Sequence, residues 1–192
     1  MRKKLILATL LLLFASLTFA QSNHMNFMGI PITGNADALA KKLIKEKGFV
    51  LDNDNQTEHP TLFGRFAGHD RCMIIIVADK NGNAFGVGVI FPIQDSWPLL
   101  YGNYSSIKSN LTTKYGEPDS TERFETTIEP TDDFDRMHQT RMGRCKYNST
   151  FYTDEGKVTL SINNVQTNCY VYLLYHDREN SIEATREAID DL

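Results

Sequence analysis

Beyond residue 20 the sequence has no apolar run long enough to cross a membrane as a helix, which takes about 20 consecutive apolar residues. It also lacks an excess of basic residues, because 20 Lys and Arg stand against 24 Asp and Glu and form no stripe. A chain this acidic binds nucleic acid and anionic membranes poorly. We therefore expect no nucleic-acid partner, and no transmembrane segment after residue 20.

Local signatures of catalysis and metal binding are missing as well. The sequence contains no HExxH, GxSxG or Walker motif, and its five histidines form no close pair. His69 and Cys72 lie close together, which raises a Cys–His nucleophile as a hypothesis, but their surroundings indicate a turn before a buried strand. The DDFD run at residues 132–135 lacks the glycine and closing glutamate of an EF-hand, and indicates a solvated acidic loop. These patterns identify no catalytic, cofactor-binding or metal-binding residue.

Cysteine is scarce: only Cys72, Cys145 and Cys169 occur, and none forms a CxxC motif. We expect small buried strand residues and one disulfide among them, provided that the compartment is oxidising. If the last three strands form a meander, Cys145 and Cys169 lie about two strand spacings apart, roughly 9.5 Å. A disulfide tolerates a Cα separation of only about 7 Å. Pairing of Cys72 with either of the others stays open.

The first 20 residues have the pattern of a secretory signal peptide. Basic residues at positions 2–4 precede an apolar run at 5–14, and Thr18-Phe19-Ala20 supplies small residues for cleavage before Gln21. Because three basic residues would leave with this segment, the formal net charge would fall by three, from −4 to −7. We expect a secreted protein, periplasmic or extracellular after cleavage.

The remaining chain divides into two stretches, residues 21–95 and 96–192, and each begins with a helix. Asn35 is a good N-cap, the apolar residues of 36–44 recur at helical spacing, and Gly48 can end the helix in the left-handed conformation. The second helix spans Trp97–Tyr115 and ends at Gly116. Because strands follow both helices, we expect an α+β fold of two related helix-plus-antiparallel-sheet halves, with the helices packed on one sheet face.

Alternating or apolar stretches predict the strands. They lie at residues 49–51, 61–67, 72–78 and 84–91 in the first half, and at 120–125, 144–153, 157–163 and 169–175 in the second. Residues 126–143 are charged and without pattern, so we expect an exposed loop there, and residues 180–192 indicate a terminal helix. Within the fourth strand, Gly86 and Gly88 share one face, which predicts close approach of a crossing helix.

Tyr170 and Tyr172 share one face of the last predicted strand with Leu174, and Val171, Leu173 and Tyr175 share the other. One face must cover the core. If the first is open, its tyrosines form an interaction surface of the type enriched in recognition sites. The alternative is that the terminal helix covers it.

Two stretches of the chain resemble short, mostly uncharacterised secreted proteins of Bacteroidetes. They are FMGIPITGNADALAKKLIKEKGF, residues 27–49, with the pattern F-x-G-I-P-I-x-G, and WPLLYGNYSSIKSNLTTKYGEP, residues 97–118, with K-Y-G-x-P. The resemblance implies a Gram-negative periplasmic or extracellular setting and no particular activity. The order of helices and strands is also similar to that of β-lactamase inhibitor proteins and small outer-membrane assembly lipoproteins, which bears on fold alone.

Together these observations favour a secreted, non-enzymatic module that binds a protein or a small periplasmic ligand through a sheet face or the 126–143 segment. Two alternatives stay open. One is a periplasmic hydrolase or other enzyme whose site is assembled from distant residues. The other is a structural protein of the cell envelope.

Overall fold

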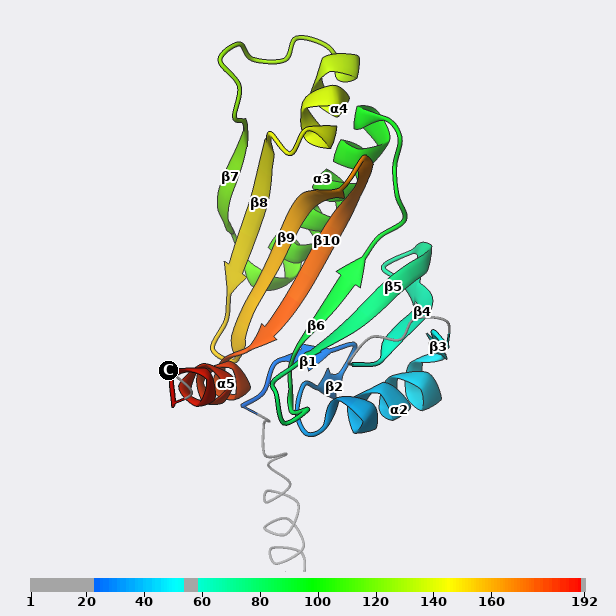
Figure 1. Cartoon of the computed structure of the whole chain (residues 1–192), viewed down its shortest axis with the longest axis vertical. Coiled ribbons are helices and arrows are strands. Elements are labelled where there is room, and N and C mark those ends of the chain that lie inside the picture. Colours follow the sequence, from blue (N-terminus) through cyan, green and yellow to red (C-terminus); the bar gives the residue numbers. More distant parts are fainter. Residues whose placement is uncertain (1–22, 54–58, 191–192) are drawn as a thin grey trace, which may run out of the picture.

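The fold, seen in a computed structural model that describes residues 23–53 and 59–190, is built on one large sheet (Figure 1). The expected signal peptide, residues 1–20, lies outside the described residues. The helices are α2 (Ala36–Lys47), α3 (Trp97–Tyr115), α4 (Asp133–Arg141) and α5 (Arg178–Asp190). An α+β fold with antiparallel strands is therefore confirmed.

The strands form a small hairpin and an eight-stranded antiparallel sheet. The hairpin pairs β1 (Asn26–Phe27) with β2 (Ile30–Pro31). The sheet has the order β3-β4-β5-β6-β10-β9-β8-β7. Its strands are β3 (Val50–Leu51), β4 (Thr61–Phe66), β5 (His69–Ala78), β6 (Ala84–Ile90), β7 (Asp119–Phe124), β8 (Cys145–Tyr152), β9 (Gly156–Val165) and β10 (Asn168–Asp177).

Two meanders make up this sheet. β3 to β6 follow α2 and pair with their neighbours in the chain, and β7 to β10, which follow α3, do the same. The meanders join where the last strand of each pairs antiparallel with the other, with Tyr172 opposite Ile90 and Leu174 opposite Gly88. Residues far apart in the sequence thus form one continuous surface.

The first two helices begin and end where the sequence predicts. The Asn35 side chain accepts a hydrogen bond from the Asp37 backbone N–H (2.9 Å), and Gly48 has φ 75° with its N–H bonded to the Ile44 carbonyl. Ser96 precedes α3 without a side-chain cap, and Gly116 (φ 86°) follows it. Glycine suits both C-terminal positions because it adopts positive φ without steric cost.

Three helices, α2, α3 and α4, close one face of the sheet. Figure 1 shows α3 behind β8, β9 and β10, and α4 also packs on these three strands. Alternate strand residues on this side are fully buried; they include Leu62, Ile74, Ile76, Val87, Val89, Phe151, Val158, Leu160, Val171 and Leu173. None of the helices in the described ranges has the length and apolar composition that a membrane span requires.

Aromatic rings fill both ends of the closed face. Phe27 of the hairpin stacks on Phe66 (centroids 5.2 Å apart) and meets Tyr175 edge-on at 5.4 Å. At the other end, the centroid of the Trp97 ring lies 5.2 Å from that of Phe124 and 5.3 Å from that of Tyr147. The N-terminal hairpin and the start of α3 are thereby fixed to the same side of the sheet.

A carboxylate at the end of β10 connects three parts of the chain. Asp177 is fully buried and accepts hydrogen bonds from the backbone N–H groups of Met25 (2.7 Å) and Asn180 (2.9 Å). The His24 ring lies 3.2 Å from the same carboxylate. The Asn180 amide in turn donates to the carbonyls of Ile32 and Ala84. Asp177 therefore joins the chain start and α5 to the sheet.

The segment expected as an exposed loop, residues 126–143, contains α4. Asp132 caps this helix by accepting from the Asp135 N–H (2.8 Å), and Asp133 pairs with Arg136 at 3.0 Å. The acidic run is thus a helix N-terminus, where carboxylates offset the positive end of the dipole. Only Met137 and Thr140 of α4 are buried, so the helix carries almost no apolar stripe for sequence periodicity to detect.

Candidate functional site

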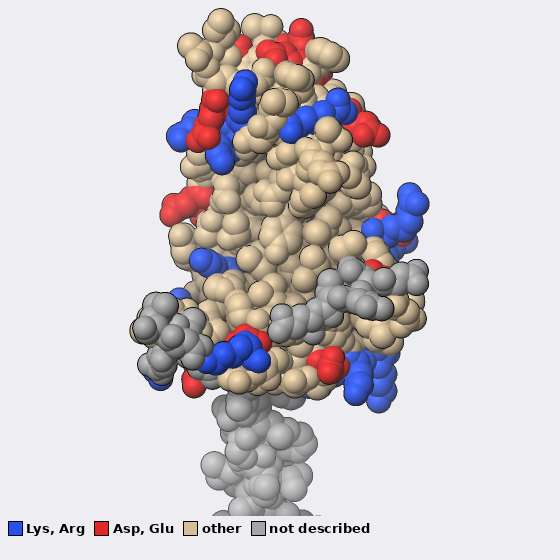
Figure 2. All heavy atoms as spheres, viewed as in Figure 1, with Lys and Arg blue, Asp and Glu red and all other residues tan. Residues whose placement is uncertain are grey.

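The opposite side of the sheet, which we call the open face, carries the other alternating residues of every strand. One row across it joins Phe63, Met73, Ile90, Tyr172, Ser161, Asn148 and Thr121, in the order β4, β5, β6, β10, β9, β8, β7. The next row joins Thr61, Ile75, Gly88, Leu174, Thr159, Thr150 and Asp119. Figure 2 views this face, and its centre shows no Lys, Arg, Asp or Glu.

The open face has an apolar part over β4, β5, β6 and β10. Its members are half-buried side chains that touch solvent on one side: Phe63, Met73, Ile75, Val77, Ile90, Tyr170, Tyr172 and Leu174. The tyrosines expected as an interaction surface, Tyr170 and Tyr172, therefore lie on the side that α2, α3 and α4 leave open. Burial raises the pKa of both hydroxyls, so they are protonated hydrogen-bond donors near pH 7.

The Tyr172 ring lies over Gly88 of the adjacent strand. A Cβ atom on Gly88 would lie 2.6 Å from the Tyr172 hydroxyl and 2.9 Å from its ring, so only glycine admits the ring there. The sequence predicts a crossing helix over Gly86 and Gly88, and this expectation is wrong. The neighbour above Gly88 is an aromatic side chain of the adjacent strand, and that strand comes from the other meander.

The polar part of the open face covers β9, β8 and β7. It presents uncharged hydrogen-bonding side chains: Thr121, Asn148, Thr150, Thr159, Ser161 and Asn163. A groove of about 340 Å³ crosses it, and Arg123 and Lys146 stand on its rim. Glu125 lies 3.7 Å from Arg123 and 3.9 Å from Lys146, so the rim keeps an excess of one positive charge.

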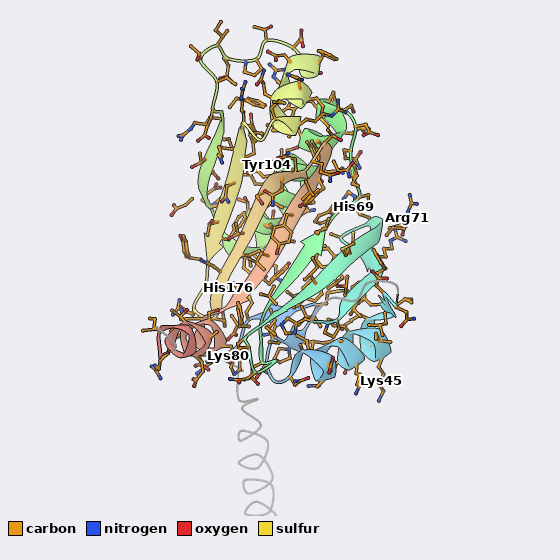
Figure 3. The ribbon with its side chains drawn as sticks, in the orientation of Figure 1. Lys45, His69, Arg71, Lys80, Tyr104 and His176 are labelled. Atoms are coloured by element: carbon orange, nitrogen blue, oxygen red, sulfur yellow. The ribbon has the colours of Figure 1, made fainter. Side chains whose placement is uncertain are left out.

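The terminal helix reaches only one end of the open face. There His176 lies beside α5 (Figure 3), with the Ser181 hydroxyl 3.0 Å from its Nε2, and a cavity of about 230 Å³ is lined by residues of α5 and of the strand ends. Phe85 meets His176 edge-on at 5.5 Å instead of sharing the closed face with Val87, because the register shifts between Val77 and Ala78. Burial, and then Lys157, lower the pKa of His176 and favour its neutral form.

A chain of polar groups runs under α3 on the closed face, from the buried Ser149 and Tyr104 out to the more exposed Glu122 and Lys108. The Tyr104 hydroxyl is within 2.7 Å of Ser149 Oγ and 3.0 Å from Glu122, which Lys108 contacts at 2.5 Å. Burial raises the pKa of Tyr104, so the phenol stays protonated and can donate. These groups satisfy one another, and the cavity beside them, about 370 Å³, opens along α3. The arrangement fixes α3 on β7 and β8.

All three cysteines are free thiols in this structure. The last three strands do form a meander, and β9 separates Cys145 in β8 from Cys169 in β10. The predicted obstacle to a Cys145–Cys169 bridge therefore applies. Cys72 lies in β5, on the other side of β6. Burial raises the pKa of Cys72 and of Cys145 to about 11, and raises that of Cys169.

The Cys–His hypothesis finds no geometric support. Cys72 is fully buried and donates its thiol hydrogen to the His69 backbone carbonyl at 3.5 Å, while the His69 ring packs edge-on against Phe91. Figure 3 shows His69, His176 and Tyr104 on separate parts of the molecule. Within residues 23–53 and 59–190, no group of three or more His, Cys, Asp or Glu side chains could hold a metal ion.

Comparison of the chain with protein families, with curated proteins and with solved structures finds no match in any of the three. The candidate site therefore depends on geometry alone. Sequence reasoning identified Tyr170 and Tyr172 but missed Phe63, Met73, Ile75 and Ile90. Met73 and Ile75 lie in β5, whose continuous apolar run is typical of a strand buried on both faces. The order of strands in the sheet was needed to bring them together.

Proposed function

We propose that this protein is an exported, non-enzymatic binding module that docks a partner protein on the apolar part of its open face. The observation that carries this proposal is the uncharged apolar surface that runs across four neighbouring strands. Soluble monomers rarely expose contiguous apolar surface without using it in an interaction. Tyrosines are enriched in such interfaces.

The surroundings of the apolar part suit a protein partner. The polar part beside it offers amide and hydroxyl groups, and charged residues such as Arg123, Lys146 and Lys157 stand at the margins. An apolar centre with a polar rim is the usual anatomy of a protein interface. The partner would bury Tyr172, Leu174 and Ile75 at the centre and form hydrogen bonds at the side of β9 and β8.

The proposal includes the finer architecture, in which residues 21–95 and 96–192 are two related halves. Each half has a helix that ends at a glycine of positive φ, Gly48 or Gly116, and then a four-stranded meander. The halves meet at β6 and β10, and that junction forms the centre of the open face. Duplication would thus supply a surface twice as wide as one meander allows.

Export is supported by the signal-peptide pattern of residues 1–20 and tested by the N-terminus of the protein recovered from its host. We expect that N-terminus at Gln21 and the protein in the envelope or medium. An intact Met1 in a cytosolic fraction would contradict export without bearing on the open face.

Docking is tested by site-specific photocrosslinking in envelope extract of the producing cell. A photoreactive residue replaces Thr159 on the open face or, as a matched control, Ala38 on the exposed side of α2. We expect a discrete crosslinked protein from position 159 only. Leu174→Asp places a charge in the apolar part and should abolish that product, whereas the charge change Lys42→Asp on α2 should leave it. Equal crosslinked products from positions 159 and 38 would contradict the docking proposal.

A further inference from the structure

We propose that β7 pairs antiparallel with β7 of a second copy, with Thr121 opposite Thr121 on the two-fold axis. The product is a dimer with one continuous sheet. This inference concerns the edge of the sheet and does not depend on what the open face binds.

The two edges of the sheet differ in their capacity to pair. β3 contributes only two residues, whereas β7 contributes six, and no strand in the described part of the chain lies beyond it. Figure 1 shows β7 at the margin of the sheet. A long edge strand is a template for strand addition unless something blocks it. β7 itself holds no proline; Pro118 immediately precedes the strand.

The backbone of β7 determines which residues can pair outward. The Glu125 N–H donates to the Arg144 carbonyl of the β8 side at 2.8 Å. Since hydrogen-bonding direction alternates along a strand, Asp119, Thr121 and Arg123 also turn toward β8. Ser120, Glu122 and Phe124 turn their backbone groups away from the sheet. A second strand would therefore bond to these three, except that Phe124 faces Pro118 when Thr121 lies on the axis, and Pro118 has no N–H to donate.

The charges of β7 complement one another when the strand meets its own copy in this register. With Thr121 on the axis, Ser120 of each copy bonds to Glu122 of the other, and Asp119 faces Arg123 twice. These charged residues form non-hydrogen-bonded pairs, in which the Cα atoms approach to about 4.5 Å and the side chains lie closest. At the margins Glu117 meets Glu125, whose carboxylate already lies near Arg123 and Lys146.

Shifting the register by one residue in either direction gives less favourable cross-strand pairs. Centring the pair on Glu122 brings two Glu122 side chains together and sets Asp119 against Glu125. Centring it on Ser120 sets Asp119 against Thr121, without a basic partner, and leaves Arg123 to face Glu117, which lies outside the strand. Charged edge strands usually oppose association with other chains. Here the same charges select one partner, a second copy, in one register.

The two-fold axis relates the open faces of the two copies. The side chains of Asp119, Thr121 and Arg123 all lie on the open face, so the pairing requires an axis perpendicular to the sheet. Both open faces then point to the same side. If the open face docks a partner, the dimer presents two sites side by side and gains from bivalent attachment.

Charge exchange tests the register by sedimentation equilibrium over a concentration series of the purified protein. We expect reversible dimerisation, with Asp119→Arg and Arg123→Asp each weakening it by about tenfold, because each turns two attractive cross-strand pairs repulsive. The double variant should restore the wild-type association. Glu46→Arg on the exposed side of α2 makes the same charge change away from the edge and should have no effect.

A disulfide trap tests the axis itself. Thr121→Cys should form an intermolecular disulfide under mild oxidation, because a Cα separation of about 4.5 Å falls within the range for a bridge. Thr159→Cys, also on the open face but two strands inside the edge, should not. A monomer at every concentration with no Thr121→Cys dimer would overturn the proposal, and so would a double charge variant that stays monomeric. Loss of photocrosslinking from position 159 with dimerisation intact would affect only the docking proposal.

Discussion

The two faces of the sheet take alternate residues from the same eight strands, yet only one is closed by helices. On the closed face, Leu160 and Phe151 are almost inaccessible, and even the polar Ser149 is buried and paired. On the open face, Tyr172 and Leu174 keep contact with solvent. Alternation assigns each side chain to a face, and packing of the helices then decides which face becomes core. The difference should appear directly in the effects of paired substitutions.

The largest contrast is expected between neighbours on β9. Leu160→Ala removes a fully buried side chain and should lower the free energy of unfolding by about 3 kcal/mol, through lost burial and a residual cavity. Thr159→Ala, one residue away on the open face, should change it by less than about 0.5 kcal/mol. Urea denaturation monitored by circular dichroism measures both. Equal losses would mean that the open face is buried in solution.

Two glycines give a second contrast. At Gly64, on the closed face, an added Cβ would lie 2.3 Å from the Phe49 ring in the core, so Gly64→Ala should destabilise by about 2 kcal/mol. At Gly88 the added Cβ meets the Tyr172 ring, which can swing toward solvent, so Gly88→Ala should cost below about 1 kcal/mol. Thermal unfolding compares the two. Gly88→Ala should also weaken any binding that uses Tyr172, whereas a larger loss of stability than Gly64→Ala would contradict the arrangement.

Removal of a single hydroxyl from either face should give a smaller difference. Tyr104→Phe deletes the group that bonds to Ser149 and Glu122, and should cost about 1 kcal/mol because Ser149 loses a buried partner. Tyr172→Phe removes a hydroxyl at the solvent boundary, and we expect almost no change in the unfolding free energy. Chemical denaturation of both variants checks this. A costly Tyr172→Phe would reveal a hydrogen bond that the described residues do not supply.

The smallest effect concerns pH at the end of the open face. Burial lowers the pKa of His176 in the folded protein, so the unfolded chain binds the proton more readily. The contribution of His176 is fully favourable above the unfolded histidine pKa, and is lost as pH falls through the lowered folded value. His176→Gln should therefore reduce the loss of stability between neutral and mildly acidic pH. Urea titrations across that range would show parallel curves if His176 were unimportant.

Much of the local structure was predictable from the chain. The Asn35 cap, the glycines after α2 and α3, and the alternation of β9 and β10 are consequences of neighbouring residues, and the structure confirms them. α4 was not predicted, because a short, mostly exposed helix gives no apolar periodicity. Its N-cap, Asp132, and the acidic residues of its first turn, Asp133 and Asp135, were the signal that could have revealed it.

The candidate site was predictable only in part. Tyr170 and Tyr172 could be assigned to one face, but whether that face was covered depended on where α5 packs. α5 crosses the end of the sheet at Asp177 and His176, so it leaves the centre open. The role of Gly88 could not be foreseen either, because its neighbour belongs to a strand more than eighty residues later in the chain.

By itself, the sequence determined most of the helices and strands, though not α4, where most of them end, and which residues of most strands share a face. These properties follow from interactions between residues a few positions apart. The tertiary structure decided that β6 pairs with β10, that one face is left open, and that β7 lies at the edge. Those outcomes depend on how distant segments compete to bury the same apolar surface, and that competition is settled only when the whole chain packs together.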